Sequence, residues 1–173
     1  MRVIGIDPGV SHLGFGVVDT AARDRLVPVA SGTIRTNPRC AFQQRLSDLH
    51  CELEKLFHQY GPEHMAIEEV FFAKNVRSAL LLGQARGVVL LSAALAHIPV
   101  FEYSATEIKK ALCSYGHAGK DQIQAMVKVL LGLEGLLTDH ASDALAASIC
   151  HAHSFRPPVA ACAGSRGCRK RAF

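Results

Sequence analysis

The sequence begins MRVIGIDPG (residues 1–9), and this stretch decides the fold. Met1 to Ile6 is rich in β-branched residues, which predicts a buried strand, and Pro8-Gly9 stops that strand. Asp7 therefore follows directly on the apolar run, at the C-terminal end of the predicted strand. An isolated Asp-Pro-Gly is more often an ordinary turn, so the meaning of Asp7 depends on the rest of the chain.

Two further segments carry acids in positions of interest. Met65-Ala66-Ile67 precedes Glu68 in the same way, and in the predicted helix that starts at Asp139, His140 and Asp143 share one face at i, i+3. Burying a charge without a partner is costly, so acids at strand ends suggest a shared cation at the edge of a sheet. The pattern predicts a divalent-metal site if the three segments meet. Taken singly, Glu68 could be a surface acid and Asp139 an acid at a helix N-terminus.

Length and composition indicate one soluble domain. The 173 residues suffice for a full core, and 49% hydrophobic with 20% charged residues is ordinary for a globular protein. The longest apolar stretch, residues 87–96, is too short to span a bilayer, and the first residues lack a signal-peptide pattern. We therefore expect a cytoplasmic protein without membrane contact.

The net charge of +4 is unevenly distributed. Residues 154–173 hold five basic residues and no acid, so the remainder is nearly neutral and the overall charge does not argue for nucleic-acid binding. Residues 74–128 hold seven Lys or Arg against three acids, which fits contact with a phosphate backbone. A solvated charged face explains that segment nearly as well.

The six cysteines show no Cys-x-x-Cys pair and no regular spacing, so we expect reduced thiols. Cys150, His151 and His153, with Cys162 and Cys168 beyond them, could in principle bind zinc. Residues 150, 151 and 153 do not share one helix face, which disfavours that site.

The rest of the chain predicts an α/β fold. Asn37-Pro38 fits an N-cap and first helical position, and Ser104 to Glu107 fits a capping box. Strands are expected at residues 1–6, 12–19, 26–35, 64–70 and 98–103, and helices at 38–60, 75–97, from 105, at 120–131 and at 139–153. Residues 154–173, rich in Pro, Gly, Ala and Arg, predict a disordered basic tail.

The element order β-β-β-α-β-α-β-α-α-α constrains the sheet. Short connections make the first three strands antiparallel, and right-handed crossovers add the last two in parallel. The result is a mixed five-stranded sheet with helices on both faces. If the first and fourth strands are neighbours, Asp7 and Glu68 end side by side.

These segments together resemble the ribonuclease H-like fold and, more narrowly, the RuvC family of Holliday junction resolvases. The resemblance covers about residues 3–153 and is carried by Ile4-Gly5-Ile6-Asp7-Pro8-Gly9, Ala66-Ile67-Glu68-Glu69-Val70-Phe71, Ala73-Lys74-Asn75, Leu82-Gly83-Gln84-Ala85-Arg86-Gly87, Pro99-Val100-Phe101-Glu102-Tyr103 and Asp143-Ala144-Leu145-Ala146. It implies one nuclease domain, residues 1–153. It also implies an endonuclease that resolves four-way DNA junctions by paired symmetrical nicks during recombination and repair.

By this resemblance, Asp7, Glu68 and Asp143 match the acidic metal ligands of the family. The fourth position is His140, where many members have Asp, and Asp139 is one residue out of register. The resemblance implies two divalent ions, Mg²⁺ or Mn²⁺. The chemistry agrees independently, because two ions about 3.5–4 Å apart can activate water and neutralise the attacked and leaving oxygens of a phosphodiester.

The resemblance also implies residues that contact DNA. Lys120 and Lys109 match lysines near the scissile phosphate, although both could be solvated surface lysines. Phe71 matches the residue that meets unstacked bases near the junction centre, and Phe72 follows it; packing in the core is the alternative for either. We further expect DNA contacts from Lys74 and Arg77.

Symmetrical nicking of two strands implies a two-fold homodimer. We place its interface on the long helix, at Leu80, Gly83, Gly87 and Leu91. The two glycines at i, i+4 permit close approach either to a partner subunit or to the helix's own sheet. The branch-migration proteins RuvA and RuvB are partners by resemblance alone.

Three other functions compete with this interpretation. An actin-like phosphotransferase shares the fold and a similar glycine turn but needs two such domains. An RNA-directed nuclease of the YqgF type shares the first two motifs. A non-catalytic junction-binding protein is disfavoured by the intact set of Asp7, Glu68 and Asp143.

Overall fold

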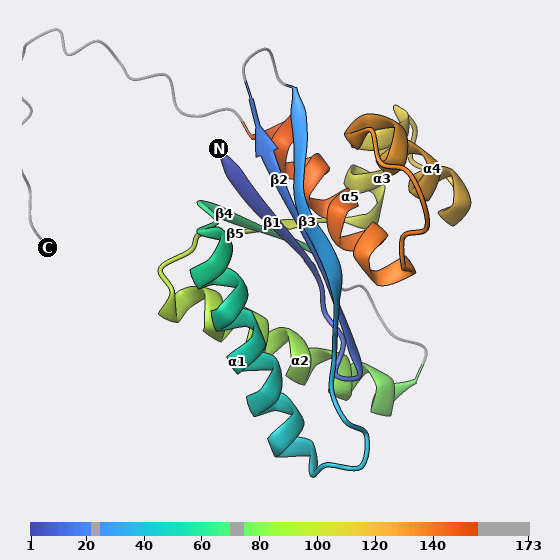
Figure 1. The fold of residues 1–173 in the computed structure, drawn as a ribbon. Coiled ribbons are helices and arrows are strands. Elements are labelled where there is room, and N and C mark those ends of the chain that lie inside the picture. The colour runs from blue at the N-terminus through green and yellow to red at the C-terminus, as the bar shows by residue number, and fades with distance from the viewer. Residues whose placement is uncertain (22–24, 70–74, 156–173) are drawn as a thin grey trace, which may run out of the picture.

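The structure is a computed structural model, and it describes residues 1–21, 25–69 and 75–155. A five-stranded sheet forms the middle layer (Figure 1). Helices α1 and α2 cover one face, and α3, α4 and α5 cover the other. The strands are β1 (Arg2–Asp7), β2 (His12–Thr20), β3 (Leu26–Arg35), β4 (His64–Glu68) and β5 (Val100–Tyr103). The helices are α1 (Phe42–Tyr60), α2 (Val76–Leu95), α3 (Ala105–Cys113), α4 (Lys120–Leu131) and α5 (Asp139–Ser154).

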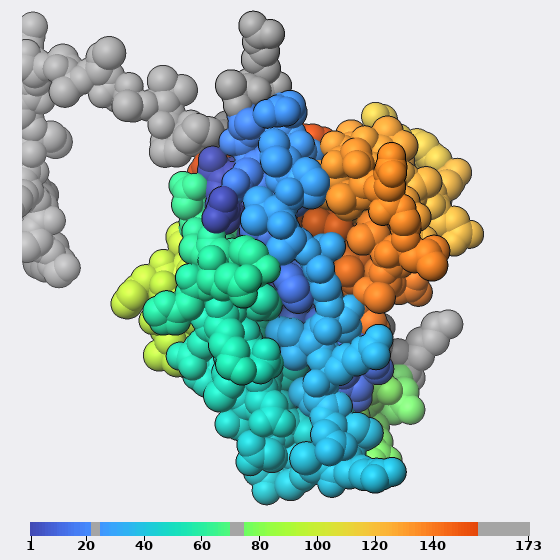
Figure 2. Space-filling model, viewed as in Figure 1, coloured from blue at the N-terminus to red at the C-terminus, as the bar shows by residue number. Residues whose placement is uncertain are grey.

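The sheet has the order β3-β2-β1-β4-β5. The pairs β1–β2 and β2–β3 are antiparallel, and β1–β4 and β4–β5 are parallel. This confirms the predicted mixed sheet, and it shows that the first and fourth strands are neighbours, which was the condition for Asp7 and Glu68 to end side by side. In Figure 2 the edge strand β3 lies on the surface between α1 and the α4–α5 side of the molecule.

Alternate residues of the strands face two separate cores. Ile4, Ile6 and Ile67 are fully buried against α1 and α2. Val3 and Ala66, one residue out of phase, are fully buried on the opposite face with α3, α4 and α5. This period-two pattern with both faces covered explains why β1 and β4 are apolar between their first and last residues.

Helix α5 packs unusually close to the sheet. A side chain at Gly5 of β1 would collide with the carbonyl oxygen of Ala144, and one at Gly14 of β2 would collide with that of His140. Ser148 of α5 donates to the carbonyl of Gly16 at 2.8 Å. The glycines therefore let the backbone of α5 lie directly on β1 and β2, which fixes its position.

Several predicted boundaries differ from the structure. Helix α1 begins at Phe42, not after Asn37, because the Asn37 side chain instead accepts from the backbone of Arg39 in a turn that precedes the helix. Strand β4 ends at Glu68, and β5 begins only at Val100. Helix α2 runs from Val76 to Leu95, with Asn75 as its N-cap. The capping box of Ser104 and Glu107 is confirmed.

The ordered structure extends slightly further towards the C-terminus than predicted. Helix α5 continues to Ser154, and the ring of Phe155 packs at 5.1 Å between ring centroids from His151. The remainder of the expected tail, residues 156–173, lies outside the described residues, and the division of the chain at residue 153 stays a prediction.

Helix α2 is long and apolar, and an 18-residue stretch of it has a mean hydropathy of 1.6. By length and composition alone, this one helix of the described chain could cross a membrane, which the ten-residue stretch considered in the sequence did not suggest. Only 22% of this 18-residue stretch is buried, although Ala85, Val89 and Ala93 pack in the core on the α1 side. One such helix is weak evidence for a membrane span.

Candidate active site

The ends of β1 and β4 bring two acids to one edge of the sheet. The parallel register pairs Ile6 with Ile67, so the next residues, Asp7 and Glu68, leave the sheet side by side as predicted. Both face the layer that contains α5, because each lies an even number of residues from Gly5 or Ala66 on that face. The parallel β1–β4 pairing is therefore what joins residues 61 positions apart in the sequence.

Helix α5 adds two side chains from its first turns. His140 Nδ1 lies 2.7 Å from Asp7 Oδ2. Asp143, one turn further along the same face, lines a cavity with Glu68. The structure thus gathers the residues predicted from the i, i+3 spacing at the edge where Asp7 and Glu68 end.

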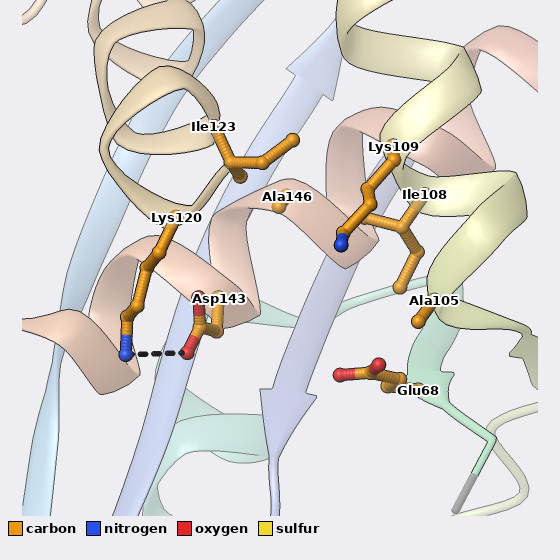
Figure 3. A pocket seen from close by; sticks show the side chains of 8 residues that line it. All are labelled: Glu68, Ala105, Ile108, Lys109, Lys120, Ile123, Asp143 and Ala146. Atoms are coloured by element: carbon orange, nitrogen blue, oxygen red, sulfur yellow. Dashed lines mark ion pairs between the residues drawn. The ribbon is translucent and has the colours of Figure 1, made fainter. Parts of the chain in front are cut away.

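A cavity of about 170 Å³ opens between the sheet edge and helices α3, α4 and α5. Figure 3 shows the carboxylates of Glu68 and Asp143 on its floor, with Lys109 reaching in from α3 and Lys120 from α4. Ile108, Ile123, Ala105 and Ala146 supply the apolar part of the lining. Both predicted lysines therefore face the carboxylates and are not simply solvated surface groups.

Lys120 bridges two acids of α5. Its Nζ lies 3.1 Å from Asp139 Oδ2 and 3.6 Å from Asp143 Oδ2 (Figure 3 shows the second pair). The hydrogen bond to Asp139 raises the pKa of Lys120 above its ordinary value, so the lysine is charged at neutral pH. Asp139 is 67% exposed and forms its ion pair with this lysine.

The three carboxylates share a perturbed environment. Burial raises the pKa of Asp7, Glu68 and Asp143, and repulsion from neighbouring carboxylates adds to the increase in each case. For Asp7, the hydrogen bond from His140 opposes this effect, and for Asp143 the charge of Lys120 opposes it. Half-buried acids that repel one another form a site that a divalent cation would relieve.

The donor set fits a hard divalent cation. Three carboxylates and one imidazole are ligand types that Mg²⁺ and Mn²⁺ accept. Among residues 1–21, 25–69 and 75–155, no three His, Cys, Asp or Glu side chains stand close enough to form a ready metal cage. His140 occupies one oxygen of Asp7 and Lys120 lies against Asp143, so both contacts have to adjust for a cation to be held.

Arg86 of α2 is a supporting residue that sequence reasoning did not single out. Its guanidinium donates to the carbonyl of Glu68 at 2.7 Å and pairs with Glu102 at 2.6 Å. The side chain is only 14% exposed. It therefore fixes the last residue of β4, from which the Glu68 carboxylate enters the site. The only sequence signal was its place in the motif Gly83 to Gly87.

His12 is a second residue that the sequence did not indicate. Its ring stacks on that of His140, with 5.5 Å between centroids and 5° between planes. No periodicity or spacing relates residues 12 and 140, so only the tertiary structure shows the pair.

Other predicted site residues lie apart from this cavity or outside the described chain. Arg77 is exposed in the first turn of α2. Leu80 and Leu91 are 63% and 58% exposed. A side chain at Gly83 or Gly87 would meet nothing within 4 Å, so these glycines do not face their own sheet. Phe71, Phe72 and Lys74 lie outside the described residues.

Two of the described residues considered for a zinc site, Cys150 and His151, are engaged in other contacts. His151 is fully buried, and its ring nitrogens lie 2.7 Å from Tyr103 Oη and 2.8 Å from His64 Nδ1. Cys150 is buried in the α3–α5 core, where burial raises its pKa to about 11. Cys162 and Cys168 lie outside the described residues.

Comparison with known proteins agrees with this geometry. Residues 3–151 match the family described as crossover junction endodeoxyribonuclease RuvC. The RuvC of Pelotomaculum thermopropionicum is 46% identical over 156 residues, covering 90% of this chain and 94% of that protein. The RuvC of Geobacter sulfurreducens is 46% identical over 154 residues, with 89% and 93% covered.

Solved structures give the same result. The structure of T. thermophilus RuvC in complex with a Holliday junction substrate matches with a TM-score of 0.84 and 36% identity, covering 88% of this chain and 93% of that one. The sheet order, the carboxylate edge and these matches over nearly the whole described chain lead to one conclusion: the chain belongs to the RuvC family of crossover junction endodeoxyribonucleases.

Proposed function

We propose that this protein resolves four-way DNA junctions by hydrolysing phosphodiester bonds at the Asp7–Glu68–Asp143 edge during recombination and repair. Its family consists of crossover junction endodeoxyribonucleases, and the same activity follows for this chain. The observation that carries the proposal is the convergence of three half-buried carboxylates at one edge of the sheet, where two of them, Glu68 and Asp143, line a cavity with two lysines. A non-catalytic binding protein would have no need of carboxylates held in so unfavourable an environment.

Divalent metal dependence follows from the family, and we propose that Asp7, Glu68, His140 and Asp143 hold two ions, Mg²⁺ or Mn²⁺. When bound, such ions supply an activated water and neutralise charge on the attacked and leaving oxygens. Asp7, which ends β1 between β2 and β4, would be one of the residues that hold them. Lys120 would then leave Asp143, remain near Asp139, and offer its charge to the scissile phosphate.

The surrounding residues are assigned to DNA binding. We propose that Lys109 and Lys120 contact phosphates at the cavity, because their amines already face it. Phe71, Phe72, Lys74 and Arg77 keep their expected roles, stacking on unpaired bases for the phenylalanines and phosphate contact for the cations. The described position of Arg77, exposed and a short distance in sequence after Glu68, supports its part.

We further propose a homodimer formed through α2. Leu80 and Leu91 are exposed, and Gly83 and Gly87 lie between them with open space above. Val76 and Leu95 extend this face, with 77% and 60% exposure. An exposed apolar stripe of this length marks an interaction surface.

A helix–helix contact explains this surface better than a membrane does. Arg86 of α2 is bound to Glu68 and Glu102, which keeps α2 attached to the sheet. RuvA and RuvB as partners, and a cytoplasmic location, are further proposals that rest on the relatives being bacterial RuvC proteins.

The decisive test is cleavage of a mobile four-way DNA junction with Mg²⁺, with Mn²⁺ and with EDTA. We expect symmetrical cuts with either ion and none with EDTA, and no cutting of linear duplex. Asp143→Asn should abolish cutting, whereas Glu134→Gln, an exposed acid away from the cavity, should not. Cleavage of structured RNA in preference to the junction would favour the YqgF-type alternative and contradict the proposal.

A further inference from the structure

The pair of rings formed by His12 and His140 has a clear structural origin. His12 opens β2, two residues before Gly14 and on the same face of that strand. Because Gly14 has no side chain, the backbone of His140 lies directly on β2. Helix α5 runs beside that strand (Figure 1). Asp7 is the register partner of Gly14 on β1. His140 is therefore held between His12 on one side and Asp7 on the other.

The contacts of the His140 ring are complementary. The rings of His12 and His140 are nearly parallel, with 5° between their planes, and they are offset, with 5.5 Å between centroids. The bond from Nδ1 to Asp7 fixes the rotation of the ring within its plane. This contact points Nδ1 of His140 at Asp7, so Nε2, on the other side of the ring, points away from that carboxylate.

A ring at this position needs external support. His140 is 44% exposed and lies in the first turn of α5, where the backbone alone leaves several ring orientations open. One hydrogen bond to Asp7 restrains the ring, but Asp7 is also expected to bind metal. A flat partner on the opposite face supplies the missing restraint without competing for either nitrogen.

We propose that His12 is a positioning residue that stacks on His140 and keeps Nδ1 of that ring directed at Asp7 and the metal site. The role rests on the proposed function of His140 as a metal ligand. It acts through the flat face of the imidazole, so a ring without nitrogens should perform it. His12 would contribute no proton and no ligand atom of its own.

The first experiment measures ring orientation in the metal-free protein. Imidazole ¹⁵N–¹H correlation spectra should show a single His140 tautomer with the proton on Nδ1 in the wild type and in His12→Phe. In His12→Ala the two tautomers should average. A His140 signal that is the same in His12→Ala as in the wild type would overturn the proposal, whatever the protein proves to cut.

The second experiment measures Mn²⁺ binding by EPR of the free ion, alongside junction cleavage. His12→Ala should weaken Mn²⁺ binding by about 2- to 10-fold, the range that the loss of one aromatic pair corresponds to. His12→Phe should stay within about twofold of the wild type. Equal impairment of His12→Phe and His12→Ala would show that a nitrogen of His12 acts directly, and would overturn the positioning role.

A double-mutant cycle supplies the control. In a His140→Asp background no ring remains to be stacked, so adding His12→Ala should change Mn²⁺ binding by less than about twofold. A loss as large as in the wild-type background would mean that His12 acts independently of His140 and would contradict the proposal. His58→Ala, an exposed histidine of α1, controls for general effects of removing an imidazole. If wild-type protein neither binds Mn²⁺ nor cuts junctions, the proposed function fails, while the metal-free spectra still decide the stack.

Discussion

At the scale of single residues, the site is defined by charge that the fold leaves poorly compensated. Asp7, Glu68 and Asp143 all have a raised pKa, caused first by burial and then by one another. Only His140 and Lys120 oppose this effect through direct contacts among the residues described. The metal-free state is therefore strained electrostatically, and this strain gives rise to measurable consequences.

Asp7→Asn should abolish cleavage, leave junction binding largely intact, and stabilise the metal-free protein. A raised pKa means that the folded state holds the ionised acid less favourably than the unfolded state does, so this acid costs stability at neutral pH. The cost disappears as pH falls through the raised pKa towards 3.8. We expect the melting temperature without metal to rise by about 2–4 °C at pH 7. The difference should vanish in acid, and a lower melting temperature at pH 7 would contradict the charge argument.

His140 and Asp139 should differ sharply when replaced. An imidazole is a softer ligand than a carboxylate, so we expect a stronger preference for Mn²⁺ over Mg²⁺ than an Asp at position 140 would give. His140→Asp should shift the preference towards Mg²⁺. Asp139→Asn should reduce cleavage only by about fivefold or less, because its pair with Lys120 is exposed. Cleavage rates over a range of both metal concentrations measure this, and an active His140→Ala beside an inactive Asp139→Asn would reverse the assignment.

At the scale of elements, α5 has two different ends. Its first turns carry the active-site residues His140 and Asp143, and its last turns carry a buried aromatic cluster. There, His151 contacts Tyr103 and His64 through its two nitrogens, and Phe101 and Phe155 pack on its ring. Burial, with the proximity of His64, lowers the pKa of His151 to about 4. The position of the catalytic end of α5 thus depends partly on a histidine that is neutral at pH 7.

The stability of the protein should therefore fall in mild acid. The unfolded His151 takes up a proton near pH 6.5, whereas the folded one does so only near pH 4. The free energy of unfolding therefore falls as the pH falls between these two values, by up to about 3 kcal/mol. Urea unfolding at pH 7, 5.5 and 4.5 should give a shallower pH dependence for His151→Phe than for the wild type. His58→Gln, exposed on α1, should follow the wild type, and parallel curves for all three proteins would exclude His151 as the cause.

At the scale of the whole molecule, the active site and the exposed face of α2 are connected through the contacts of Arg86. Arg86 ties α2 to the last residue of β4, and the apolar stripe of α2 is exposed. A partner subunit on this stripe would be connected through α2 to Glu68. A two-fold dimer would then place two equivalent sites on one junction.

The double variant Leu80→Glu/Leu91→Glu should be monomeric and should lose paired cutting. Burying two acids in a helix–helix contact is strongly unfavourable. Sedimentation should show a micromolar dimer for the wild type and a monomer for the variant, and on a cruciform plasmid the variant should give nicked rather than linear product. Val129→Glu, equally exposed but on α4, is the matched control. A fully active monomeric wild type would contradict the proposed dimer.

Much of this architecture could be predicted from local sequence. The apolar runs before Asp7 and Glu68 define β1 and β4, and the capping box of Ser104 and Glu107 was predicted from its residues. The start of the first helix was predicted wrongly because the side chain at that position can form either of two local hydrogen bonds. Asn37 can cap a helix or close a turn, and only the surrounding chain selects the turn.

What the sequence determined by itself is the order of the elements and the acids at their ends, because periodicity and turn residues act over a few neighbouring positions. The tertiary structure decided which side chains meet. The stack of His12 on His140, the place of Lys120 between two acids, and the outward face of Gly83 all depend on how α5, α4 and α2 pack. Residues 12 and 140 meet because Gly14 lets α5 lie on β2, and such long-range contact leaves no periodic trace in the chain.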